Sequence, residues 1–192
     1  MHAAEVGDLR GGPASEAVVA GYRFEDPRVD REGLQLARTE ELARQKLEAL
    51  AREVIGQLQA RHPEAARTAL HAAPDLPTLP LDPARMRLLL RNLLDNALRH
   101  SAGAPLPPEL HLSTEGQGIR IEVRDHGPGV PDEQIPHLAE PFFRPDTART
   151  RAQGGVGLGL YLCKLVAQAH GGTFEVRNAR PGLAVRVVLP PR

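Results

Sequence analysis

The stretch GGVGLGL at 154–160, which continues as YLCKLV, is the first place where residue types and spacing suggest chemistry. Glycines that open an apolar helical pattern are typical of a phosphate site, because helix amides and the helix dipole favour negative charge. A Walker loop requires a lysine and a hydroxyl residue after its last glycine, but Leu160 and Tyr161 follow here. A dinucleotide-binding turn requires a buried strand before its glycines, but the charged stretch RPDTARTRAQ at 144–153 precedes them. The cluster therefore indicates a phosphate site of another class, or simply a helix start packed tightly against a neighbour.

Polar side chains one turn apart form a second group that could do chemistry, on a predicted helix that ends near His100. Asn92, Asn96 and His100 share one face of this helix. Magnesium takes only one or two protein oxygens beside phosphates and water, so the amide oxygen of Asn96 is a sufficient ligand. Arg99 and His100 can donate to phosphate oxygens through charge-assisted bonds worth roughly 1.5–3 kcal/mol each. The alternative is an ordinary exposed helix face, although asparagine is a poor helix former.

Asp125 is a third candidate, because it ends a predicted strand and is followed by Gly127 and Gly129. A buried carboxylate only accepts hydrogen bonds, and the exocyclic amine of adenine donates one. Guanine presents a carbonyl oxygen at the same place, so Asp125 is expected to select adenine. The two glycines are expected to let the backbone approach the base without an intervening side chain. The alternative is an ordinary turn that an aspartate opens.

The overall composition excludes several classes of function. The chain has 192 residues, of which 41% are hydrophobic and 25% charged, as in one buried domain with an appendage. A net charge of zero and 3% aromatic residues argue against a nucleic-acid surface. No apolar run of the sequence is long enough to span a bilayer or resembles a signal peptide. The single cysteine, Cys163, excludes an internal disulfide, fits a reducing cytoplasm and is expected as a small buried residue on a helix.

The elements that position these residues follow from periodicity and capping signals. Asp82 and Pro83 predict a helix start, and leucines at three- and four-residue spacing then predict one buried stripe up to His100. Gly171 is expected to end the helix that the glycine cluster opens. The other expected elements are a helix over 29–61, extended pieces at 67–72 and 78–81, strands at 109–114 and 118–125, and two final strands that carry Phe174 and Val176, then Leu183, Val185, Val187 and Leu189. These elements predict an α+β fold with one sheet covered by helices on a single face.

Four stretches occur in an order that resembles the successive boxes of a known domain. They are RNLLDNALRH at 91–100, RDHGPGV at 124–130, EPFFR at 140–144 and GGVGLGL at 154–160. Together they resemble the ATP-binding domain of sensor histidine kinases, in the Bergerat-type superfamily that includes DNA gyrase B subunits, Hsp90 chaperones and MutL. The resemblance covers roughly residues 46–192. It implies a two-layer α/β sandwich with a mixed, mostly antiparallel sheet, preceded by an N-terminal helical segment.

The resemblance also implies a site for ATP and Mg²⁺. Residues 144–157 resemble the lid that closes over bound ATP, with Arg144, Arg149 and Arg151 as candidates to reach the γ-phosphate. The alternative for each arginine is a solvated loop charge. The expected ATP-binding residues are Asn92, Asn96, Arg99, His100, Asp125, Gly127, Gly129, Arg144, Arg149, Gly155, Gly157, Leu158 and Gly159. Asn96 is the expected magnesium ligand.

The asparagine at position 92 narrows the expected mechanism. In gyrase-like relatives the corresponding residue is a glutamate that activates water, whereas an asparagine cannot act as a general base. The resemblance therefore implies a histidine protein kinase that transfers the γ-phosphate of ATP to a histidine on a separate helical hairpin, and then to an aspartate of a response regulator. We expect a bacterial two-component protein with a homodimeric parent, cytoplasmic or anchored in the inner membrane. The alternatives are an anti-sigma serine kinase of the same ATP fold, which usually lacks the PFFR box, and a degenerate ATP fold that acts only as a scaffold.

The chain departs from the kinase pattern in the phosphate acceptor. None of its eight histidines lies in a His-Glu-x-x-x-Pro motif, so no catalytic acceptor is identified and the isolated chain is expected not to autophosphorylate. The stretch GLQLARTEELARQ resembles the end of the second hairpin helix. We therefore expect a loosely ordered tail at 1–27, a helical remnant of a dimerisation hairpin at 28–45 and the ATP-binding domain at 46–192. Ala184 stands where the family often has a Gly-Ser/Thr pair, which removes a hydroxyl contact but not the last strand.

Overall fold

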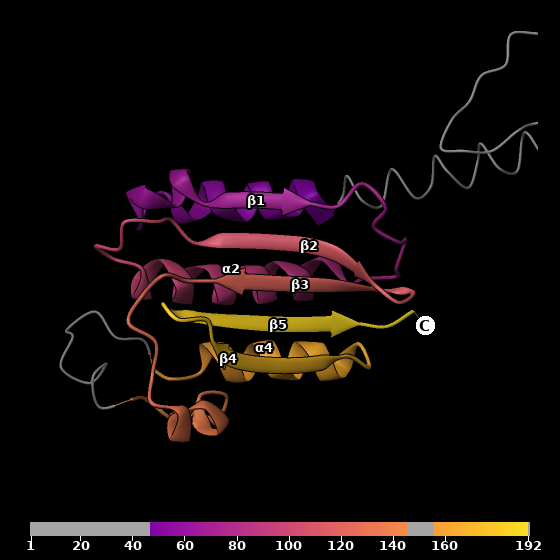
Figure 1. Ribbon diagram of the computed structural model, residues 1–192. Helices are drawn as coiled ribbons and strands as arrows, with labels where there is room; N and C mark the ends of the chain where they lie inside the picture. Colours follow the sequence, from indigo (N-terminus) through magenta and orange to yellow (C-terminus); the bar gives the residue numbers. More distant parts are fainter. Residues whose placement is uncertain (1–46, 146–155, 192) are drawn as a thin grey trace, which may run out of the picture. The chain divides into compact units, whose positions relative to one another are not determined.

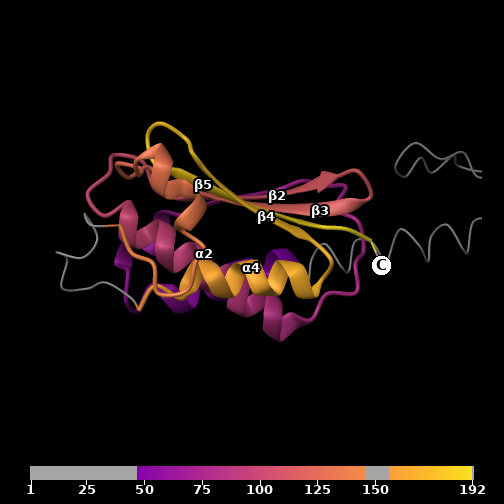
Figure 2. The ribbon, with the colours of Figure 1, turned by 90° about the horizontal axis from the view of Figure 1, so that it is seen from below.

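A sheet of five strands and the helices on one of its faces make up the described part of the chain. The structure is a computed structural model that describes residues 47–145 and 156–191, all of which belong to one compact unit. The strands form one layer and the helices form the other, and the second face of the sheet carries no α-helix of the described residues (Figure 1 and Figure 2). The predicted α+β fold, a two-layer α/β sandwich, is confirmed.

The sheet has the strand order β1-β2-β3-β5-β4. Its strands are β1 (Ala69–Ala72), β2 (Glu109–Glu115), β3 (Gly118–Arg124), β4 (Thr173–Asn178) and β5 (Leu183–Leu189). β1 and β2 run parallel, and the other three neighbouring pairs are antiparallel. The sheet is therefore mixed and mostly antiparallel, as predicted, and the last strand forms with an alanine at position 184.

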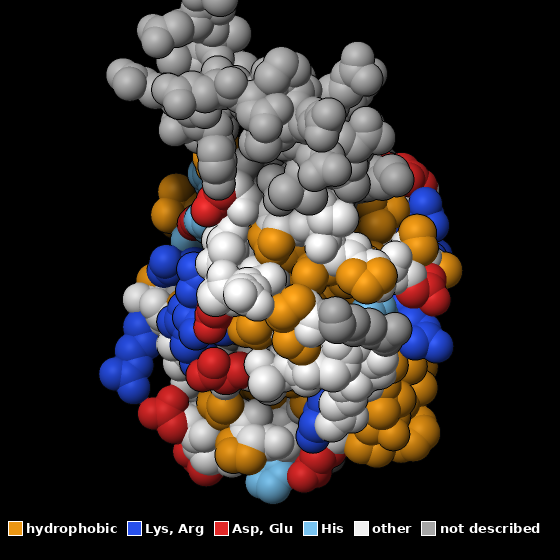
Figure 3. Space-filling view, turned by 90° about the vertical axis from the view of Figure 1, so that its right-hand side faces the viewer, with side chains coloured by type: hydrophobic (Ala, Val, Ile, Leu, Met, Phe, Trp, Pro, Cys, Tyr) orange, Lys and Arg blue, Asp and Glu red, His pale blue; other side chains and the backbone are white. Residues whose placement is uncertain are grey.

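Alternation along the central strand β3 explains why one face of the sheet is covered. Ile119 and Ile121 are buried together with Val123, as their spacing predicts, while the charged residues between them point to the other face. Ile121 pairs with Leu112 of β2 and with Val187 of β5, which are also buried, so the apolar row continues across the sheet. The opposite face carries charged side chains, which gather along the left edge of Figure 3. We call this second face the open face of the sheet.

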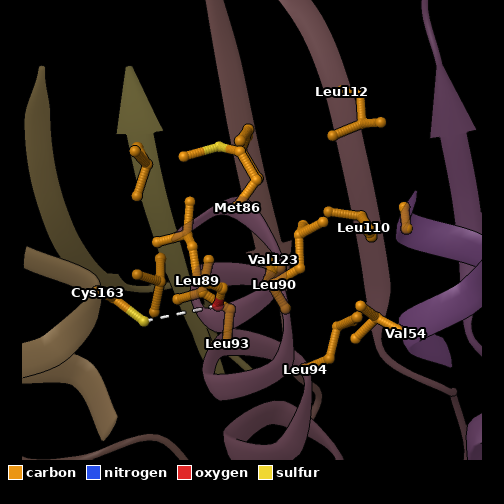
Figure 4. Close-up of a cluster of buried hydrophobic side chains, with 14 of the residues drawn as sticks. Val54, Met86, Leu89, Leu90, Leu93, Leu94, Leu110, Leu112, Val123 and Cys163 are labelled. Atoms are coloured by element: carbon orange, nitrogen blue, oxygen red, sulfur yellow. Dashed lines mark hydrogen bonds between the residues drawn. The ribbon is translucent and has the colours of Figure 1, made fainter. Parts of the chain in front are cut away.

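The helix α2 (Pro83–His100) begins as its sequence predicts. The Oδ1 atom of Asp82 accepts two amides of the first turn, at 2.9 and 3.2 Å. The buried stripe consists of Met86, Leu89, Leu90, Leu93, Leu94, Ala97 and Leu98. Figure 4 shows side chains of this stripe packed against Leu110 and Val123 of the sheet. Burial of this stripe is what fixes the polar face of α2 in place.

The helix α4 (Gly159–Ala169) packs beside α2 and ends at the predicted glycine. Gly171 has a φ of +71°, and the amides of Gly171 and Gly172 bond to the last turn of the helix, both at 2.9 Å. Cys163 is buried, as predicted, and its thiol lies 3.7 Å from the carbonyl of Leu89 (Figure 4). Burial raises the pKa of this thiol to about 12, so it stays protonated and inert.

The helix before β1 is described from residue 47 to residue 58. Leu47 and Leu58 are buried, as the apolar stripe predicted for 29–61 requires. The rest of that predicted helix, the expected tail and the expected hairpin remnant lie outside the described residues. Among the described residues, no helix has the length and apolar character that a membrane crossing needs.

Three short segments differ from what the sequence predicts. The extended piece predicted at 78–81 joins no strand. Pro77 and Pro80 lack the amide hydrogen that a sheet ladder needs, which accounts for the error. The break after the first helix is itself ordered as the 3-10 helix η1 (Pro63–Arg67). A second 3-10 helix, η2 (Asp132–His137), follows β3 where no element was predicted.

Candidate nucleotide-binding site

The predicted site residues that the structure describes gather where β3 and α2 end and where α4 begins. This region lies on the left-hand side of Figure 1, beside the loop that continues from β3 into η2. Residues more than thirty positions apart in the sequence therefore come together at one end of the sheet.

Asp125, the residue predicted to recognise adenine, is held by backbone groups at the end of β3. It is only 3% exposed, its amide donates to the carbonyl of Leu183 at 2.9 Å, and its Oδ1 accepts the amide of Gly127 at 2.9 Å. Burial raises the pKa of this carboxyl above its ordinary value, and the hydrogen bond from the Gly127 amide offsets part of the rise. A buried carboxylate favours a ligand that donates a hydrogen bond to it.

The loop after Asp125 is fastened to the end of α2. The amide of His126 donates to Oγ of Ser101 at 3.1 Å, and Ser101 is the buried C-cap of α2. A Cβ atom on Gly127 would clash with the carbonyl oxygen of His100. The protein's own backbone therefore requires glycine at position 127, which the sequence explained only by the approach of a base. Sequence reasoning also missed Ser101, whose available signal was a small hydroxyl residue directly after the helix.

Gly129 and the end of β4 fix the next part of this loop. Gly129 has a φ of +72°, in the left-handed region that favours glycine, and a Cβ atom there would lie 2.8 Å from Oδ1 of Asn178. Asn178 accepts the amide of Val130 at 3.3 Å and donates to its carbonyl at 2.8 Å. Asn178 thus ties the loop to β4. The sequence did not reveal this role, because the two partners are 48 residues apart.

Gly182 supports Asp125 from the turn between β4 and β5. Its φ is +82°, and a Cβ atom there would clash with the carbonyl oxygen of Asp125. The close approach of these two backbones leaves no room for any other residue at position 182. Sequence reasoning did not single out this glycine, since nothing near it in the sequence suggests chemistry.

Of the two asparagines on one face of α2, Asn92 lies toward the start of α4. Nδ2 of Asn92 donates to the carbonyl of Leu88 at 2.8 Å, which orients the amide within its own helix. A Cβ atom on Gly159 would lie 3.3 Å from Oδ1 of Asn92, so the glycine lets the start of α4 approach this oxygen. Asn96, one turn further along α2, is half-buried and makes no side-chain hydrogen bond with another described residue. Its amide oxygen thus has no competing partner among these residues.

Arg99 is engaged by its own helix. Its guanidinium forms an ion pair with Asp95, whose Oδ1 atom lies 3.0 Å from Nε2 of His62. Phosphate binding by Arg99 would require this ion pair to open. His100 lies on the stripe of the asparagines, and its charge favours the ionised form of Asp125.

The start of α4 offers backbone amides. Leu158 is its N-cap, and no side chain of the described residues caps the helix. Gly157 has a φ of +80°, and a Cβ atom there would lie 2.9 Å from the backbone of Phe142. The amide of Phe142 donates to the carbonyl of Gly157 at 2.9 Å. The PFFR stretch is therefore joined by backbone contacts to the glycine stretch that opens the helix.

Three predicted phosphate contacts, Arg149, Arg151 and Gly155, lie outside the described residues. Arg144 is half-buried next to that segment. Contacts between these residues and phosphate stay predictions.

Comparison with known proteins identifies the domain. Residues 81–192 match the family described as histidine kinase-, DNA gyrase B-, and HSP90-like ATPase. The sensor histidine kinase YkoH of Bacillus subtilis (strain 168) is 42% identical over 108 residues, which cover 56% of this chain and 23% of that protein. The adaptive-response sensory kinase SasA of Nostoc sp. (strain PCC 7120 / SAG 25.82 / UTEX 2576) is 34% identical over 145 residues, covering 73% of this chain and 35% of that protein. The chain thus spans about a quarter to a third of the length of these relatives.

Solved structures agree with the sequence relatives. The mycobacterial sensor histidine kinase MprB superposes with a TM-score of 0.60 at 27% identity, covering 75% of this chain and 95% of that one. Full-length ShkA in complex with AMPPNP superposes with a TM-score of 0.64 at 28% identity, covering 74% of this chain and 29% of that one. The family model matches residues 81–192, which is more than half of the chain. The chain therefore belongs to the family of histidine kinase-, DNA gyrase B- and HSP90-like ATPases, and it contains the ATP-binding domain in the form found in sensor histidine kinases.

Proposed function

We propose that this chain binds ATP with Mg²⁺ and serves as the catalytic domain of a two-component histidine kinase. The observation that carries the proposal is the buried carboxylate of Asp125, which backbone groups hold at the end of β3. Such a carboxylate gains a hydrogen bond from the amine of adenine, whereas guanine would place a carbonyl oxygen against it. Adenine is therefore bound and guanine is rejected at Asp125.

The phosphates are bound at the other end of the site, where α4 begins. The first-turn amides of α4 have no side-chain cap among the described residues, and the helix dipole favours negative charge there. Gly159 lets this backbone lie close to Asn92 of α2, and Gly157, before the N-cap Leu158, lies against the backbone of Phe142. Arg144, Arg149 and Gly155 belong to the lid that adds contacts to the phosphates.

The residues of α2 fit a magnesium ion bound together with the triphosphate. Asn96 provides an amide oxygen without a competing hydrogen bond among the described residues, and Asn92 presents its oxygen toward the start of α4. Neutral oxygen donors of this kind suit Mg²⁺, which takes its other ligands from phosphates and water. When bound, the ion neutralises phosphate charge. The contribution of the chain is to hold the two amide oxygens on one face of a rigid helix.

Phosphate transfer is favoured over hydrolysis by the side chain at position 92. The amide of Asn92 cannot remove a proton from water, and its Nδ2 is already bonded to the carbonyl of Leu88. ATP therefore stays intact until an acceptor histidine reaches the γ-phosphate. We propose that this acceptor lies on a helical hairpin of a homodimeric parent protein in the cytoplasm, and that a response regulator receives the phosphate afterwards. The sensor kinases among the relatives support this proposal over an anti-sigma function.

Three of the described histidines have partners within the domain. His62 contacts Asp95, His126 contacts Glu109, and Nδ1 of His170 donates to the carbonyl of Val166 at 2.8 Å. Each ring is thus engaged within the domain. We therefore propose that the chain alone binds nucleotide without phosphorylating itself.

Two measurements test the proposed function. Calorimetry is expected to show binding of ATP in the presence of Mg²⁺ and no binding of GTP at the same concentrations. Radiolabelled ATP is expected to leave no phosphate on this chain, and to label a helical-hairpin domain of a sensor kinase when that domain is added in trans. Equal affinity for ATP and GTP would refute adenine recognition by Asp125. A stable phosphohistidine on this chain would refute the separate acceptor.

A further inference from the structure

The open face of the sheet carries a group of side chains that the nucleotide site does not use. His71 of β1 and His111 of β2 are partners in the parallel register, and their rings stack with centroids 4.6 Å apart at 17°. Glu109 lies two residues before His111, on the same face of β2. These three side chains line a hollow of about 820 Å³ on the open face.

The possible ligand atoms of His71, Glu109 and His111 lie close together. One nitrogen of each histidine and a carboxylate oxygen of Glu109 all lie within 4.8 Å of one another. Nε2 of His111 is 2.9 Å from Oε2 of Glu109, and a cation between the residues would replace that hydrogen bond. His71 is exposed, while His111 and Glu109 are half-buried, so small side-chain rotations can shorten the remaining distances. Strand pairing holds the three Cα atoms, and only the side chains need to move.

The buried residue His126 orients the carboxylate of Glu109. The second oxygen of Glu109, Oε1, lies 2.9 Å from Nε2 of His126, whose side chain is 4% exposed. Nδ1 of His126 has no hydrogen-bond partner among the described residues. The contact with His126 thus fixes one oxygen of Glu109, while the other oxygen, Oε2, faces His111. An outer partner that orients an ionised ligand is a regular feature of metal sites.

We propose that His71, Glu109 and His111 bind a transition-metal ion of the Zn²⁺ class on the open face of the sheet. Two imidazoles and one carboxylate suit Zn²⁺, Co²⁺, Ni²⁺ or Cu²⁺, whereas Mg²⁺ and Ca²⁺ require oxygen ligands throughout. Three protein ligands leave a coordination position for water. Arg124 stands opposite Glu109 in the register of β2 and β3, and its positive charge is expected to weaken the binding of a cation. None of these three ligands belongs to the proposed ATP site.

The test is a titration of the full chain with Zn²⁺ and Co²⁺, prepared without a polyhistidine tag and without nucleotide, in excess Mg²⁺. We expect one ion per chain by calorimetry and a visible ligand-field absorption from bound Co²⁺. His71→Ala and His111→Ala are each expected to weaken binding at least about tenfold, and Glu109→Gln by about tenfold as well. Because His71 is exposed, its replacement leaves the core intact, which a thermal melt verifies.

The matched control is His137→Ala. Nδ1 of His137 lies 2.9 Å from Oε1 of Glu140, which gives a histidine–carboxylate pair outside the proposed site. The proposal expects unchanged metal affinity in this variant. It is overturned by a stoichiometry well below one ion per chain, by wild-type affinity in both His71→Ala and His111→Ala, or by an equal loss in His137→Ala.

Discussion

The two ends of the nucleotide site are built differently. At the base end, Asp125 is 3% exposed and is surrounded by backbone from β3, the end of α2 and the β4–β5 turn. At the phosphate end, Phe142 is 68% exposed and Val156 is 71% exposed, although both are large and apolar. The first end is completed by the fold itself, whereas the second presents apolar side chains to solvent beside an uncapped helix start.

The difference indicates how the free energy of binding is distributed. Groups that the fold already holds lose little conformational entropy when a ligand arrives, so the proposed selection of adenine would need no ordering of the base end. Exposed side chains and free amides at the phosphate end must become ordered when the triphosphate binds. Base specificity is thus expected to resist substitutions in the glycine stretch, while triphosphate affinity is expected to be sensitive to them.

The largest effect is expected from Asp125→Asn. The variant places an amide donor where the amine of adenine also donates, so ATP affinity is expected to fall by about 100-fold or more, or about 2.8 kcal/mol. Isothermal titration calorimetry measures the loss. A cooperative thermal melt with a midpoint at or above that of the wild type shows that the fold of this variant survives. ATP affinity equal to that of the wild type would show that Asp125 does not form the base end of the site.

Gly157→Ala is expected to cause the next largest loss of ATP affinity, and it tests the phosphate end alone. A non-glycine residue at a φ of +80° costs on the order of 1–3 kcal/mol, so ATP affinity is expected to fall about tenfold while adenosine affinity is unchanged. The ratio of the two affinities, from calorimetry and NMR titration, is the measurement. Gly116→Ala is the control, because Gly116 has a φ of +61° with no atom near its Cβ position and lies in the β2–β3 hairpin. An equal loss of adenosine binding in Gly157→Ala would show that the two ends are not separable.

Asn96→Ala tests the metal part of the phosphate end. Loss of one neutral oxygen ligand is expected to weaken ATP binding severalfold in Mg²⁺, and to leave the weaker binding in EDTA unchanged. Paired titrations in the two buffers give the difference. The assignment fails if the variant loses the same factor with and without the ion.

The smallest expected effect is on the pH dependence of folding stability without nucleotide, which involves Asp125 at the base end. Because burial raises the folded-state pKa of Asp125 above 3.8, the folded chain binds this proton more tightly than the unfolded chain does. The contribution of this group to stability is therefore fully present below pH 3.8 and is lost as pH rises through the folded-state pKa. Asp125→Asn is expected to be more stable than the wild type at pH 7, by a margin that shrinks as pH falls. Urea unfolding across this range measures the margin, and a constant margin would contradict the prediction.

Local signals explain which parts of the fold the sequence predicted. The N-cap Asp82, the leucine spacing of α2 and the alternation in β3 act within a few residues, so they can be interpreted without tertiary information. The prediction of an extended piece at 78–81 was wrong because a strand needs a partner ladder, which Pro80 cannot join. The same distinction between local signals and distant contacts applies to the site.

Contacts between distant residues explain what the sequence could not predict at the site. Asp125 was found from the chemistry of its side chain, but its supports Ser101 and Asn178 come from other elements, and their polar types alone are common in loops. The spacing of α2 places Arg99 next to the asparagine stripe. The ion pair of Arg99 with Asp95, one turn earlier, is local, but the contact of Asp95 with His62 joins residues 33 positions apart and appears only in the packed structure.

The amide of Asp125 donates to the carbonyl of Leu183, which begins β5, so the residue proposed to recognise the base continues the ladder between β3 and β5. Its backbone can shift only if that ladder opens. Deuterium exchange at this amide should therefore be as slow as in the middle of the sheet, whether or not nucleotide is present. Preference for adenine would then persist as long as the native sheet does. Loss of this preference would be an early sign that the sheet is opening.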